Sequence, residues 1–147
     1  MTGLIVTLFF ISGGIATIVS PKIEKYINAN GVVVLSFLTI LPLTILFLSV
    51  LEKSKFLACA LFILTGFFIL LSVGVILVQA QKTMPKYTGV ISGVMQGFSW
   101  GLGALFLAPL GVVGQNYGVE KILILMSLIA FLVGLYTLKN KCLEIKD

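Results

Sequence analysis

Five long apolar runs restrict this chain to a membrane fold, because no charge lies inside any of them except at a margin. A helix needs roughly 20 predominantly apolar residues to cross the hydrocarbon core of a bilayer. Backbone groups in hydrocarbon must be paired within their own segment, and the sequence lacks the alternation of a membrane barrel. It therefore predicts an all-α membrane protein with five transmembrane helices. The predicted helices span residues 4–20, 31–51, 56–80, 89–113 and 119–138.

The segments between these runs carry the charge and predict the orientation of the chain. The segments that follow the first, third and fifth runs hold seven of the ten lysines, and the other two hold three. Cytoplasmic loops are enriched in positive charge, so we expect an external N-terminus and a cytoplasmic C-terminus. The membrane would be a plasma membrane or a bacterial inner membrane. This topology accounts for the net charge of +5, so no nucleic-acid partner is expected.

The residue types needed for catalysis or metal binding are scarce. The chain has no histidine, and its predicted helices contain no carboxylate away from their margins. Cys59 lies in a predicted helix and Cys142 in the cytoplasmic tail, so we expect neither a disulfide nor a metal site from them. The sequence therefore predicts a protein that is not an enzyme and that needs no cofactor.

A stripe of glycines marks the fourth predicted helix. Each interior glycine costs a helix in water about 1 kcal/mol relative to alanine, but in lipid small residues at a spacing of four let two helices approach closely. The pattern predicts a helix-packing surface, either fixed or sliding during a transport cycle. Its residues, here called the glycine stripe, are Gly89, Gly93, Gly97, Gly101 and Gly103.

Polar side chains beside the glycine stripe are candidates for a substrate path. Ser92, Gln96 and Trp100 are spaced by four and so share one helix face. A glutamine at mid-membrane depth needs a partner, which leaves open a helix–helix hydrogen bond or the lining of an aqueous cavity. Gln81 ends the preceding run, where it is either part of the same path or an ordinary interfacial residue.

The stretch "VQAQKTMPKYTGVISGVMQGFSWGLG" resembles the tenth and eleventh helices of major facilitator superfamily transporters, and most closely the fosmidomycin resistance group of antibiotic efflux proteins. The other predicted helices are similar in order and length to helices eight, nine and twelve. The resemblance implies the C-terminal portion of that fold and a lipid bilayer around it. The matching residues are Gln81, Pro85, Gly89, Ser92, Gly93, Gly97, Phe98, Gly101, Leu102 and Gly103.

The sequence departs from the family pattern at two cytoplasmic sites. Lys82 stands where the family has an acidic residue after the glutamine. In the segment "SPKIEKY", Lys22 and Lys25 keep the basic character of the family's loop motif, whereas Pro21 and Glu24 replace its Asp and Gly. In the family this loop braces one conformation through charge contacts, so the two departures bear on gating.

The resemblance implies a portion of an exporter for small molecules or drugs. Such transporters have about twelve helices in two halves around a central site, and counterparts of the first seven are expected to be missing here. We therefore expect a truncated or split transporter that is inactive without the missing helices. The alternative is a self-contained small membrane protein that oligomerises through the glycine stripe to form a pore or transporter. A structural or assembly subunit is a third interpretation.

Overall fold

The computed structural model describes residues 2–140, and long helices make up nearly all of them. The elements are α1 (Thr2–Leu51), α2 (Lys55–Thr83), the short 3₁₀ helix η1 (Pro85–Tyr87), α3 (Thr88–Tyr117) and α4 (Val119–Asn140). The four long helices are apolar and long enough to cross a membrane. No strand occurs within the described residues, which confirms the prediction of an all-α fold, and the length and apolar composition of the helices agree with a membrane protein.

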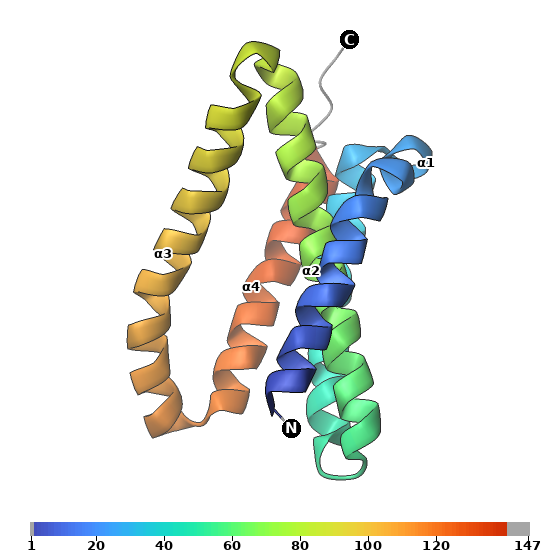
Figure 1. Ribbon diagram of the computed structural model, residues 1–147. Helices are drawn as coiled ribbons and strands as arrows, with labels where there is room; N and C mark the ends of the chain where they lie inside the picture. The colour runs from blue at the N-terminus through green and yellow to red at the C-terminus, as the bar shows by residue number, and fades with distance from the viewer. Residues whose placement is uncertain (1, 141–147) are drawn as a thin grey trace.

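The structure has four long apolar helices rather than the five predicted. The predicted spans 4–20 and 31–51 both belong to α1, because the polar segment between them is helical instead of forming a loop. At Asn28 the helix breaks, with φ 64° and ψ 158°. Asparagine is among the few residues besides glycine that take a positive φ readily. Figure 1 shows the chain of α1 turning sharply near its label, so that its two halves run in different directions.

A tight turn connects α3 to α4. Gly118 has a φ of 94° and its N–H donates to the carbonyl of Gly114 at 2.9 Å. A glycine in this region of φ ends a helix without the steric penalty that a Cβ would bring. Because the turn needs a single residue, α4 begins directly after it at Val119.

The core lies where both halves of α1 pack against α2. Its buried apolar side chains are Ala16, Ala29, Val32, Val33, Leu71 and Val75. A Cβ added at Gly74 would lie 2.5 Å from Ser20 Oγ and 3.2 Å from Thr17 Cα, so the two helices approach closely there. Thr17 also donates from Oγ1 to the carbonyl of Leu70 at 3.4 Å. Small residues and hydroxyl groups thus hold α1 and α2 together, as expected for helices in lipid.

The second half of α1 also packs against α4. A Cβ at Gly134 would lie 2.9 Å from Phe37 Cβ and 3.4 Å from the backbone nitrogen of Leu38. Ser127 and Thr137 of α4 are buried as well. We name α1, α2 and α4 together the packed block.

Helix α3 stands outside the packed block. Gly114 is its one buried residue, and most of its other side chains are exposed. In Figure 1, α3 runs along one side of the molecule, joined to α2 at one end and to α4 at the other. The helix that carries the glycine stripe is therefore the least covered of the long helices.

Candidate functional site

A cavity of about 310 Å³ lies between α2 and α3. Helix α2 contributes only aliphatic side chains to its wall, namely Ile69, Leu70, Val73, Ile76 and Leu77. Helix α3 contributes Met95, Gln96, Ser99 and Trp100. No charged side chain lines the cavity, so its polarity comes from one amide, one hydroxyl and the indole N–H.

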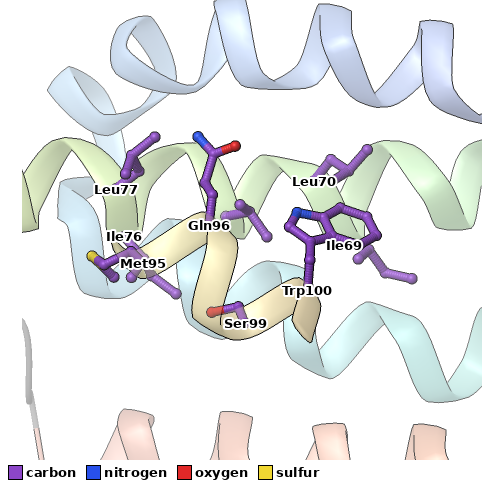
Figure 2. Close-up of a pocket in the computed structure, with 9 residues that line it drawn as sticks. Ile69, Leu70, Ile76, Leu77, Met95, Gln96, Ser99 and Trp100 are labelled. Atoms are coloured by element: carbon purple, nitrogen blue, oxygen red, sulfur yellow. The ribbon is translucent and has the colours of Figure 1, made fainter. Parts of the chain in front are cut away.

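Gln96 and Trp100 project from α3 in the same direction (Figure 2). Their spacing of four places them one turn apart on one face, as the sequence predicts. Figure 2 also shows Ile69 and Leu70 of α2 beside the indole ring. Both α3 side chains are exposed, with 60% of Trp100 accessible, so the cavity opens on that side. A role of these two residues in a substrate path stays a prediction.

Gln81 and Ser92 join the ends of α2 and α3. The Gln81 side chain donates from Nε2 to Ser92 Oγ at 2.7 Å, and Ser92 donates to the carbonyl of Thr88 at 2.7 Å. Ser92 lies one turn before Gln96, and Gln81 lies one turn after Leu77. The bond between them therefore lies toward the η1 end of the cavity. The structure brings these two predicted site residues together. They hydrogen-bond to each other and do not line the cavity.

Glu24 accepts two side-chain hydrogen bonds from the last turns of α2. Its Oε1 lies 2.8 Å from Lys82 Nζ and 2.7 Å from Gln79 Nε2. The Glu24 side chain is 12% exposed and the Lys82 side chain 55%. We name these three residues the Glu24 latch. Lys82 and Glu24, two of the residues at which the sequence departs from the pattern that it resembles, thus form an ion pair.

Lys22 and Lys25 lie outside the Glu24 latch, since both are exposed on α1. Their spacing from Glu24 places them on other faces of the helix. The C-terminal tail with Cys142, which is predicted to be cytoplasmic, lies outside the described residues. Within residues 2–140, no group of three His, Cys, Asp or Glu side chains could hold a metal ion.

The glycine stripe faces open space in this structure. A Cβ added at any of its glycines would meet no atom within 4 Å, leaving aside the chain next to it. The stripe therefore makes no packing contact with the rest of residues 2–140. Its role as a helix-packing surface stays a prediction that requires a neighbour from outside this chain. The glycines in close contact, such as Gly74 and Gly134, belong to the packed block instead.

Comparison with known proteins finds a similarity that covers most of the chain. The chain is 28% identical over 115 residues to the fosmidomycin resistance protein of Escherichia coli strain K12. The alignment covers 78% of this chain and 27% of that protein, so the chain spans about a quarter of its relative's length. No family model and no solved structure matches the chain. Its apolar helices and this similarity indicate a multi-pass membrane protein that resembles a fosmidomycin resistance protein over part of that protein's length.

Proposed function

We propose that this chain is the C-terminal portion of a major facilitator superfamily exporter of small molecules, similar to the fosmidomycin resistance group. The single observation that carries the proposal is the incomplete cavity between α2 and α3. Its wall has both apolar and polar side chains, as an amphipathic cargo requires. No other helix within residues 2–140 covers its open side. The similarity to the Escherichia coli protein over about a quarter of its length supports the same interpretation.

In this proposal the two halves of α1 cross the membrane separately, so the chain crosses five times. The break at Asn28 supports it, because the polar segment around it would lie at a membrane surface. The lysine distribution supports an external N-terminus, with the Glu24 latch and the tail in the cytoplasm. Labelling of a cysteine introduced after Lys146 from either side of the membrane tests this orientation. External labelling would contradict it.

The chain is proposed to be inactive alone. Alternating access needs two halves that enclose a site, and this chain supplies part of one half. Its apolar spans hold no carboxylate through which a proton gradient could drive cargo movement. The missing helices, from the same gene or from a split partner, would cover α3 and complete the cavity.

Efflux in cells tests this proposal directly. The chain would be expressed alone and together with the first seven helices of the Escherichia coli relative, with membrane insertion verified in both cases. We expect the drug tolerance of the empty vector from the chain alone and a gain when both pieces are present. Robust efflux by the chain alone, lost on Gln96→Ala, would contradict the proposal.

A second candidate is a homo-oligomer that forms a pore or transporter through the glycine stripe. The open surface along the stripe favours it, since small residues in lipid suit contact with a second copy. Disulfide crosslinking of Gly93→Cys separates the two candidates. With Cys59 and Cys142 replaced by serine, a homodimer trapped in high yield would support the oligomer, whereas a disulfide formed only with a cysteine introduced into the co-expressed helices would support the transporter portion.

A further inference from the structure

We propose that a second cavity, between the two ends of α1 and the start of α2, binds a single-chain amphiphile with an anionic head, of the chemical class of the long-chain fatty acids. We name it the Lys55 cavity, and its volume is about 550 Å³. It shares no lining residue with the cavity between α2 and α3, so the inference goes beyond the proposed function and does not depend on it. Besides Lys55 and Cys59, its lining residues are apolar and include Ile5, Val6, Phe47 and Phe62.

The Lys55 cavity lies at the end of the molecule where α1 begins and where the chain turns from α1 into α2. Ile5 and Val6 belong to the start of α1, and Leu51 and Lys55 flank the turn. Figure 1 shows the N-terminus and this turn at the same end of the molecule. Lys55 is exposed and directly precedes the apolar run of α2. A lysine that flanks an apolar span lies at the membrane surface, with hydrocarbon along the rest of the span.

Lys55 supplies the charge of this site, as the one charged residue among those that line the cavity. Its ammonium has no ion-pair partner within residues 2–140, whereas that of Lys82 is paired with Glu24. The nearest carboxylate along the chain, Glu52, is exposed and does not line the cavity. An exposed lysine at a membrane surface attracts an anionic head that stays hydrated. The head can therefore bind without transfer into an apolar medium.

The apolar part of the site continues along one face of α2. Lys55, Cys59 and Phe62 are spaced by four and three residues, so they share that face. Phe62 also lines a further cavity of about 390 Å³, whose wall on α2 extends to Ile69. At 1.5 Å per residue, the path from Lys55 to Ile69 is about 20 Å long. A long alkyl chain whose head is at Lys55 thus has an apolar wall along most of its length.

Aromatic rings separate the Lys55 cavity from the further cavity. Phe47 and Phe62 line both, with ring centroids 5.9 Å apart, and the ring of Phe9 lies 4.9 Å from that of Phe62. The wall thus offers a ligand mainly hydrocarbon and aromatic surface, which suits an alkyl chain. One charge and one apolar path match one head and one chain. The hydroxyl groups of the further cavity each donate to a carbonyl of their own helix, and they belong to Thr44, Thr65 and Ser127.

Cys59 provides a reporter, because its thiol lines the Lys55 cavity and is partly exposed. With Cys142→Ser it is the only thiol of the chain. The full chain would be placed in phosphatidylcholine nanodiscs, and the rate of Cys59 alkylation by N-ethylmaleimide would be followed by mass spectrometry. Palmitate is the probe. Hexadecanol is its uncharged counterpart, and phosphatidylglycerol carries the same charge on a lipid with two chains.

Three variants test the role of the charge. Lys55→Gln removes it and Lys55→Arg keeps it. Lys53→Gln is the matched control, because Lys53 is an exposed lysine at the same end that does not line the cavity. Each alkylation rate is divided by the rate of the same variant without ligand, so that a change in the reactivity of the thiol itself cancels.

We expect palmitate to slow the alkylation of Cys59 in a saturable manner. Hexadecanol should need a mole fraction about fivefold higher for the same effect, which corresponds to one charge near a membrane surface. Lys55→Gln should weaken the protection by palmitate about fivefold for the same reason. Lys55→Arg and Lys53→Gln should leave it unchanged.

Several results would overturn the proposal. They are alkylation that palmitate does not slow, equal protection by palmitate and hexadecanol, and a loss in Lys55→Gln that is matched by Lys53→Gln or by Lys55→Arg. Protection by phosphatidylglycerol at the same mole fraction as palmitate would assign the site to a two-chain membrane lipid and overturn the proposed occupant. None of these measurements depends on efflux, so the proposed function is tested separately.

Discussion

The packed block and α3 use the same residue, glycine, in opposite environments. Gly74 in α2 lies so close to α1 that a Cβ would meet Ser20 Oγ at 2.5 Å. Gly93 in α3 belongs to a far more regular glycine pattern, yet a Cβ there would meet nothing within 4 Å. The comparison shows that regular spacing makes a surface capable of close packing, whereas a contact exists only where a neighbour covers it.

The largest effect is expected from Gly74→Leu. The added side chain would meet Ser20 and the backbone at Thr17, which cannot move aside as a flexible side chain can. We expect a loss of about 3 kcal/mol in the free energy of unfolding in detergent, at the upper end for overpacked cores. Denaturant titration followed by circular dichroism measures it. A change below that of Gly93→Leu would break the comparison between the two helices.

A smaller effect is expected from removing the acceptor of the Glu24 latch. Glu24→Ala leaves the Gln79 amide and the Lys82 ammonium without their shared acceptor. We expect a loss of about 1–2 kcal/mol in the free energy of unfolding. Lys82→Met should cost about 1 kcal/mol or less, because the ammonium is largely exposed and solvent screens the ion pair.

The control for the latch is an exchange of its charges. The double variant Glu24→Lys with Lys82→Glu restores an ion pair of opposite polarity between α1 and α2. If the two residues interact as the structure describes, the double variant should be more stable than the sum of the two single variants predicts. Strict additivity would show that the pair contributes nothing.

The next smaller effect on stability is expected from a substitution at the junction of α2 and α3. Ser92→Ala removes the acceptor of Gln81 at the η1 end of the cavity. The loss of about 1 kcal/mol should loosen α3 from α2 and speed tryptic cleavage after Lys86 several-fold. Ser99→Ala, on the same helix but away from this bond, serves as the control and should cleave at the parent rate.

The smallest effect on the chain alone is expected from Gly93→Leu. The side chain has open space, and leucine favours a helix over glycine by about 0.5–1 kcal/mol, so stability should be unchanged or slightly higher. Under the proposed function, the co-expressed N-terminal helices should then pull down less of the variant than of the parent chain. A loss of stability equal to that of Gly74→Leu would show that the stripe is already buried, as in a homo-oligomer.

The fold class could be predicted from the sequence because lipid imposes strict rules on charge and backbone pairing. The later helices α2, α3 and α4 cover residues 56–80, 89–113 and 119–138 and extend beyond them. The sequence did not predict how the chain connects the first two spans, which is by a helical segment with a break at Asn28. The segment before Asn28 contains Pro21 and several charges, which indicated a loop, yet its backbone is helical up to that residue.

The candidate site could be predicted only along one helix. The spacing of Gln96 and Trp100 is enough to place them on a common face of α3. Their partners on α2, and the bonds Gln81–Ser92 and Glu24–Lys82, depend on how helices pack. Glu24 and Lys82 are 58 positions apart in the sequence, and no local spacing links them. No pattern within the sequence singles out this pair.

The corner at Asn28 fixes the rotation of the second half of α1 relative to the first. The backbone is helical on both sides of Asn28 up to the break, so the corner has no loop residues that could accommodate an insertion or a deletion. One residue more would turn the following helix by about 100°. Val32 and Val33 would then leave the core for lipid, and Phe37 would leave Gly134. The length of this corner is therefore as constrained as the side chains that it positions.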